Sequence, residues 1–217
     1  MATPRPRRRI TKPQKGVTKA APYKVFERAV REQMDRAGLQ LVGRLYDPLE
    51  PTGDPKFPFR KAGDVNPADF YAQVPETGGL VLVEVKMISQ GRSVACERSQ
   101  AEELRRRNKS RVWNPKTQRM QSRSSFGGVQ FHQADSLVKA HNTPHGFGIL
   151  VVGFSRHGVR MLDGHGLRLW MEQGDSEEGV DRKSISLEHF DEFGWELGSV
   201  EHGWAFPYGF FQSKKGP

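Results

Sequence analysis

Cysteine is nearly absent from this chain, and long apolar runs are missing altogether. Cys96 is the single cysteine among 217 residues, which excludes an intrachain disulfide and a cysteine-rich zinc site. No apolar run reaches the roughly 18 residues that a membrane-spanning helix needs. The basic N-terminus is not followed by the apolar segment of a secretory signal. We therefore expect an intracellular protein without a membrane segment.

Acidic residues are missing from two stretches, residues 1–22 and 105–123. The whole chain has a formal net charge of +9 and a pI of about 9.8. This balance favours a polyanionic partner, with nucleic acid ahead of an acidic membrane surface. For residues 1–22, a solvated tail that binds nothing is the alternative. The expected phosphate contacts are Arg7, Arg8 and Arg9 in the first stretch, and Arg105, Arg106, Arg107, Lys109, Arg111, Lys116, Arg119 and Arg123 in the second.

The length and the low hydrophobic content, 35%, predict a single domain with a modest core. We divide the chain into a disordered basic arm at 1–22, a core domain at 23–164 and a C-terminal extension at 165–217 packed on that core. Periodicity and turn residues predict the secondary structure. The expected helices are 23–37, 97–107 and 131–141, the expected strands are 68–74, 80–88, 147–154, 158–164 and 167–174, the expected loops are 45–67 and 105–123, and a small strand with a short helix is expected within 184–197.

Three charged residues, Asp69, Glu84 and Lys86, stand on the two extended segments between Asn66 and Lys86. The residues Pro75–Gly79 have turn chemistry, so the flanking segments are expected to pair as a hairpin. Strand side chains alternate between faces, which puts Glu84 and Lys86 on the same face. Asp69 lies on the partner segment. The pattern predicts that two acids and a lysine converge at one edge of a sheet.

Such a trio suits metal-assisted hydrolysis of phosphodiesters. Carboxylate oxygens hold Mg²⁺, with Mn²⁺ as a substitute, and the ion acidifies a bound water. Lys86 would orient that water or stabilise the charge of the transition state. The alternative is a cross-strand ion pair between Glu84 and Lys86 on a solvated face.

The segments Pro67-Ala68-Asp69 and Glu84-Val85-Lys86 resemble the signature of the PD-(D/E)XK nuclease superfamily. This resemblance implies an α/β fold with an αβββαβ restriction-endonuclease-like core, a mixed central sheet and flanking helices. Within the superfamily, "KVFERAV" and "FHQADSLVKA" resemble segments of Holliday junction resolvases of the RecU and archaeal Hjc type. The resemblance covers roughly residues 20–163, so the C-terminal extension lies outside it.

The resemblance to resolvases implies roles for three further residues. Glu27 matches a glutamate on the opening helix and would be an additional acid near the metal. Gln133 would help to position the water or the phosphate, and His132 would contact nucleic acid. The surface alternative for Glu27 is an ion pair with Arg31, four residues further along the helix.

These patterns together lead to an expected function. We expect an Mg²⁺-dependent, structure-selective DNA endonuclease that resolves four-way junctions in the cytoplasm of a bacterial or phage-infected cell. A four-way junction has two-fold symmetry, so paired nicks favour a homodimer. The alternatives are another PD-(D/E)XK endonuclease of the restriction or repair type, and a basic nucleic-acid-binding protein without catalysis.

Overall fold

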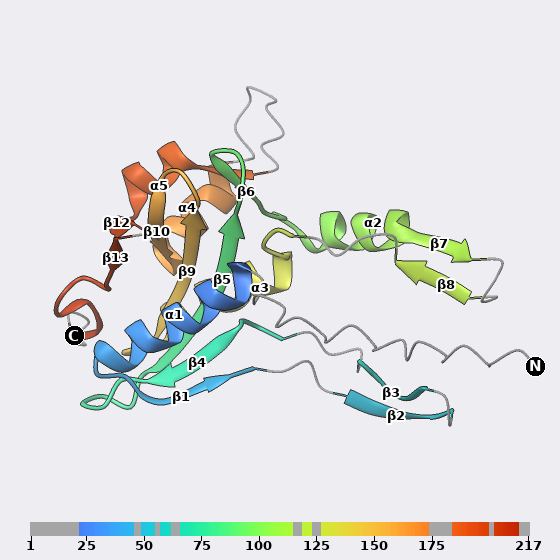
Figure 1. Cartoon of the computed structure of the whole chain (residues 1–217), viewed down its shortest axis with the longest axis horizontal. Coiled ribbons are helices and arrows are strands. Elements are labelled where there is room, and N and C mark those ends of the chain that lie inside the picture. Colours follow the sequence, from blue (N-terminus) through green and yellow to red (C-terminus); the bar gives the residue numbers. More distant parts are fainter. Residues whose placement is uncertain are drawn as a thin grey trace, which may run out of the picture.

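The computed structural model of the protein describes residues 22–45, 49–54, 57–61, 66–114, 119–122, 127–173, 184–199 and 202–212. For 49–54, 57–61, 106–114 and 119–122 the description covers the backbone only. A mixed central sheet with helices on both faces forms the body of the molecule (Figure 1). The expected mixed α/β class is therefore confirmed. The predicted arm at 1–22 falls almost wholly outside the described residues.

The central sheet has seven strands in the order β1-β4-β5-β9-β10-β12-β13. Neighbouring strands are antiparallel except for β5 and β9, which are parallel. The strands are β1 (Gln40–Arg44), β4 (Phe70–Gln73), β5 (Leu80–Ile88), β9 (Phe147–Phe154), β10 (Gly158–Asp163), β12 (Trp195–Ser199) and β13 (Gly203–Trp204). Because β5 and β9 have neighbours on both sides and helices on both faces, their sequences are almost continuously apolar.

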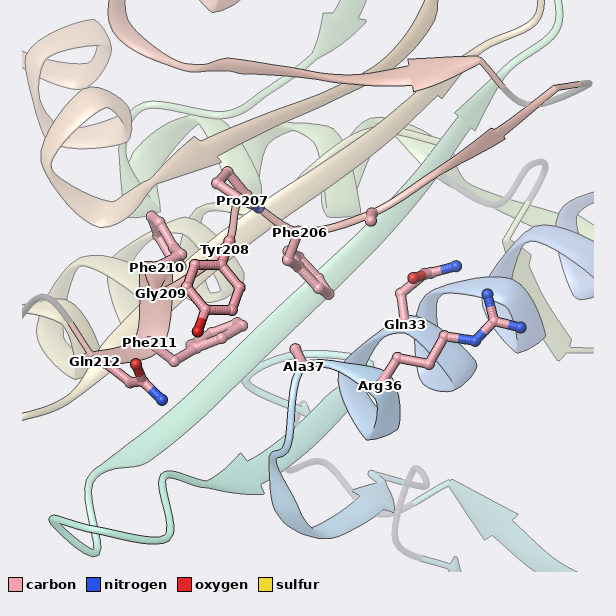
Figure 2. Close-up of a pocket in the computed structure, with 11 residues that line it drawn as sticks. Gln33, Arg36, Ala37, Phe206, Pro207, Tyr208, Gly209, Phe210, Phe211 and Gln212 are labelled. Carbon is pink, nitrogen blue, oxygen red and sulfur yellow. The ribbon is translucent and has the colours of Figure 1, made fainter.

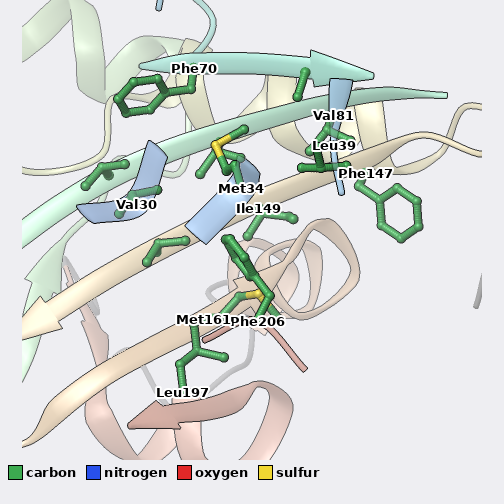
Figure 3. Close-up of a cluster of buried hydrophobic side chains, with 14 of the residues drawn as sticks. Val30, Met34, Leu39, Phe70, Val81, Phe147, Ile149, Met161, Leu197 and Phe206 are labelled. Carbon is green, nitrogen blue, oxygen red and sulfur yellow. The ribbon is translucent and has the colours of Figure 1, made fainter. Parts of the chain in front are cut away.

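One face of the sheet is covered by α1 (Pro22–Arg36). Its residues Phe26, Val30 and Met34 recur every four positions and are buried against the odd-numbered residues of β5. Gly38 ends the helix with a φ of +80°, a conformation that favours glycine. Figure 3 shows this cluster, which also includes Phe206 from the C-terminal part of the chain. Residues beyond 165 thus contribute both strands and core side chains to the same body.

The opposite face is covered by α3 (Phe131–His141), together with α4 (Gly164–Glu172) and α5 (Leu187–Phe193). Leu137 and Ala134 of α3 are fully buried on this face. Helix and sheet approach closely at Gly148, where a Cβ atom would lie only 1.8 Å from the backbone oxygen of Leu137. Gly148 is therefore the residue that lets α3 rest directly on β9. A short two-stranded sheet of β6 (Ser93–Ala95) and β11 (Ser184–Ser186) adjoins this face.

The predicted strand at 167–174 is wrong, because residues 167–172 belong to α4. The Asp163 side chain caps the helix by accepting a hydrogen bond from the Gly166 backbone N–H at 2.9 Å. Leu167 and Trp170, three residues apart, are then buried on the same side. The alternation of Leu167 and Leu169 also fits a strand, and the cap and the helical spacing decide between the two.

Two predicted loops contain regular structure. The segment 45–67 includes a hairpin of β2 (Leu49–Asp54) and β3 (Phe57–Lys61). The segment 105–123 includes the end of α2 (Gln100–Ser110) and a hairpin of β7 (Arg111–Asn114) and β8 (Arg119–Ser122). Both hairpins extend away from the central sheet toward the same side of the molecule (Figure 1).

A short helix near the C-terminal end of the described residues adds a side chain to the core. A short 3-10 helix, η2 (Phe210–Gln212), follows β13 and places Phe211 in the core beside α1. Among the described residues, no helix has both the length and the apolar character needed to cross a membrane.

Candidate functional site

Glu84 and Lys86 lie side by side on the face of β5 that α3 covers. The Lys86 ammonium forms an ion pair with Glu84 Oε1. The exposed fraction is 0% for the Glu84 side chain and 13% for that of Lys86, so this is not an ion pair on a solvated face. A buried carboxylate is costly unless its surroundings compensate the charge. The sequence had suggested a position at one edge of the sheet. The pair lies instead on β5, an interior strand between β4 and β9.

Asp69 sits directly before β4 and continues its pairing with β5. Its backbone N–H donates to the Val83 carbonyl at 3.1 Å. Its carboxylate oxygen Oδ2 accepts a hydrogen bond from the Val85 backbone N–H at 2.9 Å. The Asp69 carboxylate therefore lies against the backbone between Glu84 and Lys86, and the predicted convergence of these three residues is present.

Burial raises the pKa of Glu84 from 4.5 to about 7. The positive charge of Lys86 opposes this shift, and the negative charge of Asp69 adds to it. A raised pKa in a carboxylate that feels the charge of another carboxylate is typical of sites that bind cations or transfer protons. The second oxygen of Glu84, Oε2, is buried and accepts no hydrogen bond from any described residue.

Gln133 reaches this site from the first turn of α3. The Gln133 side-chain oxygen accepts a hydrogen bond from the Gln130 backbone N–H at 3.0 Å, which fixes the side chain in a capping box. Hydrogen bonding from Gln133 also lowers the pKa of Glu84, against the larger effect of burial. The structure thus brings Gln133 to Glu84, and its expected role in positioning the water or the phosphate stays a prediction.

Glu27 is buried on α1, and its carboxylate accepts a hydrogen bond from the Arg44 guanidinium at 2.7 Å. The ion pair recorded for Glu27 is with β1, not with Arg31 along the helix. The pairing with Arg44 could not be read from the sequence, because it depends on how β1 lies beside α1. Glu27 is connected to the other acids through Tyr23.

Tyr23 is a site residue that the sequence analysis missed. Its hydroxyl lies 3.4 Å from Asp69 Oδ2 and 3.4 Å from the Val85 carbonyl oxygen. Burial, followed by the negative charges of Asp69 and Glu27, raises the pKa of Tyr23 far above its ordinary value. The one available signal was its position four residues before Glu27, which places both on the same side of α1.

The donor set at this point consists of hard oxygen atoms, which suit Mg²⁺ or Mn²⁺. It comprises the Asp69 carboxylate, the unpartnered Oε2 of Glu84 and the Val85 carbonyl. Within the described part of the chain, no group of three or more His, Cys, Asp and Glu side chains is arranged to hold a metal ion. A cation here would therefore use two carboxylates, a backbone carbonyl and water, and Glu27 would act from further away.

His132 faces protein. Its ring nitrogen Nδ1 lies 3.0 Å from Glu103 Oε1, and its backbone N–H donates to Glu103 Oε2 at 3.2 Å. The Glu97 carboxylate accepts a hydrogen bond from the preceding backbone amide, that of Phe131, at 3.4 Å. These two buried acids, which we call the clamp acids, hold the N-terminus of α3 to the base of α2. The predicted contact of His132 with nucleic acid stays a prediction.

The basic residues predicted to bind phosphate are only partly covered by the structure. Arg105 is exposed on α2. Five others are placed by their backbone on α2, β7 and β8: Arg106, Arg107, Lys109, Arg111 and Arg119. The remaining five lie outside the described residues: Arg7, Arg8, Arg9, Lys116 and Arg123.

A pocket of about 370 Å³ lies elsewhere on the molecule (Figure 2). It is formed by the C-terminal end of α1 and by the segment 205–212. None of the acids, the lysine or the glutamine of the site lines it. Comparison of the chain with models of protein families and with curated proteins found no match.

Proposed function

We propose that this protein is a divalent-cation-dependent DNA endonuclease that hydrolyses phosphodiester bonds. The observation that carries the proposal is the group of Asp69, Glu84 and Lys86, in which Glu84 is fully buried and one of its oxygens accepts no hydrogen bond from the described residues. Carboxylates held close together at a backbone carbonyl, with a lysine beside them, match what metal-assisted hydrolysis needs.

The residues divide the work. Asp69 and Glu84 hold the cation, with the Val85 carbonyl as a third oxygen. Bound there, Mg²⁺ or Mn²⁺ supplies a Lewis acid that acidifies water and neutralises charge on the phosphate. Lys86 stabilises the negative charge that develops on the phosphate or orients the attacking water. Gln133 keeps the Glu84 carboxylate in place, and Glu27 adds negative potential behind Tyr23.

The finer assignment is to the restriction-endonuclease-like core. In chain order, α1 is followed by β1, β4 and β5 of one sheet, and α3 and β9 come next. This order supports an αβββαβ core, with the two hairpins as insertions. The resemblance to RecU-type and Hjc-type resolvases favours four-way junctions as substrate and a homodimer as the active form, in the cytoplasm of a bacterial or phage-infected cell.

The test compares cleavage of a four-way junction, a nicked duplex and an intact duplex of the same sequence. We expect cleavage in Mg²⁺ or Mn²⁺, none in EDTA, and a preference for the junction of at least about 100-fold. Lys86→Ala should abolish cleavage and keep DNA binding. The matched control is Lys139→Ala, because Lys139 is exposed and forms a surface ion pair with Asp135.

Other outcomes point to the alternatives. Equal cleavage of the junction and the intact duplex would indicate a general endonuclease of the restriction or repair type. Tight binding of DNA without cleavage in either metal would indicate a binding protein, and it would contradict the proposal.

A further inference from the structure

Tyr23 is a hydrogen-bond donor whose single hydroxyl proton has several acceptors around it. Its single hydroxyl proton faces Asp69 Oδ2 and the Val85 carbonyl oxygen, each at 3.4 Å. A hydrogen bond with the Glu27 carboxylate and the charge of Glu84 act on the same hydroxyl. One proton therefore serves three acceptors from three different parts of the chain.

The two long distances mean that neither hydrogen bond is strong. Hydroxyl-to-oxygen bonds are normally 2.7–2.8 Å long and weaken as the distance grows. At 3.4 Å from each of these two oxygens, the hydroxyl is held only weakly by either of them. Displacing the hydroxyl from these oxygens should therefore cost little.

The hydroxyl acts here as a donor, because a tyrosine keeps its proton at neutral pH. What its proton does is partly offset the repulsion between Asp69 and its acidic neighbours, which is also what a cation would do.

We propose that the Tyr23 hydroxyl is a placeholder for the divalent cation. This inference rests on the proposed function, because it concerns the same oxygens. The hydroxyl lies 3.4 Å from both Asp69 Oδ2 and the Val85 carbonyl oxygen, and a cation that binds between these two oxygens must displace it. Tyr23 is thus a positioning residue that holds the acids together before the cation arrives and lowers the affinity of the site for that cation.

The test is a Mn²⁺ titration of the full-length protein without DNA, with free Mn²⁺ measured by electron paramagnetic resonance. Tyr23→Phe keeps the ring and removes the competing donor, so we expect the Kd for Mn²⁺ to fall about 3- to 10-fold. Tyr71→Phe is the matched control and should leave the Kd unchanged, because Tyr71 is exposed on β4. Tyr23→Met should shift the Kd in the same direction and serves if the Phe variant does not fold.

The outcomes separate the two proposals. An unchanged or higher Kd in both Tyr23 variants would overturn the placeholder role and leave the nuclease proposal standing. Both proposals require the wild type to bind Mn²⁺ and require Asp69→Asn to abolish that binding. If either requirement is not met, both proposals fail.

Discussion

Two pairs of acids lie near the first turn of α3, and their surroundings differ. The clamp acids, Glu97 and Glu103, accept hydrogen bonds from backbone amides at the helix N-terminus. Glu84, with Asp69 nearby, has a raised pKa and an oxygen that accepts no hydrogen bond from the described residues. Burial alone therefore does not identify a functional acid. The distinguishing feature is a carboxylate that stays close to a second negative charge while its own hydrogen-bonding capacity remains unfilled.

The largest expected difference between the two pairs is in catalysis. Asp69→Asn removes a negatively charged ligand and should reduce junction cleavage at least about 100-fold, with the fold retained. Glu97→Gln keeps an acceptor for the Phe131 amide and should change cleavage less than about 10-fold. Single-turnover cleavage rates and circular dichroism would check both. Similar losses in the two variants would remove the distinction between site and clamp.

The pH dependence of stability should differ next. Because the pKa of Glu84 is raised from 4.5 to about 7, the folded protein binds this proton more tightly than the unfolded chain does. The contribution of Glu84 to stability therefore falls as the pH rises from about 4.5 to about 7 and is constant above that range. The total change is at most about 3 kcal/mol.

Glu84→Gln cannot titrate, so its stability should lack this decline. Urea unfolding at several pH values, with a chelator present, would measure it. Glu103→Gln provides the comparison, because it replaces a buried acid outside this site. A Glu84→Gln variant that loses stability with pH as steeply as the wild type would show that Glu84 titrates normally.

The clamp acids should matter for stability rather than for chemistry. Glu103→Ala leaves the His132 amide and ring without their partner, at a cost of about 1–3 kcal/mol in the free energy of unfolding. Glu103→Gln keeps an acceptor and should cost less. Denaturant unfolding of both variants at pH 7.5 would test this. No change in the Ala variant would mean that α3 does not depend on the clamp.

The smallest effect is expected for the ion pair between Asp135 and Lys139 on the surface of α3. Asp135 pairs with Lys139 at 2.6 Å, one turn along the helix, and the Lys139 side chain is 74% exposed. Surface pairs of this kind contribute about 0.3–0.5 kcal/mol. Lys139→Ala should therefore change the urea midpoint only slightly and leave cleavage unchanged. A large effect on cleavage would extend the site to the outer face of α3.

The sequence was most informative where periodicity and local turns decide the structure. The helical spacing of Phe26, Val30 and Met34 predicted α1, and the turn between β4 and β5 fixed a register that brings Asp69 to Glu84. By contrast, the prolines within β2 and β3 suggested a loop in place of a hairpin.

The parts of the site that could not be predicted depend on tertiary packing. Tyr23 reaches Asp69 across 46 positions of the chain, and His132 meets Glu103 across 29. No local pattern specifies either approach, because each is set by how a whole helix lies on its neighbours. Sequence reasoning can therefore find the acids of a strand more readily than the helical residues that surround them.

Gly148 has a consequence for the reach of the glutamine. Gly148 lies on the same face of the sheet as Glu84 and permits α3 to rest on β9 without an intervening side chain. Even one added methyl group at position 148 would have to lift the helix, and Gln133 would rise with it. The distance between the Gln133 side chain and Glu84 therefore depends on the absence of a side chain larger than hydrogen at position 148.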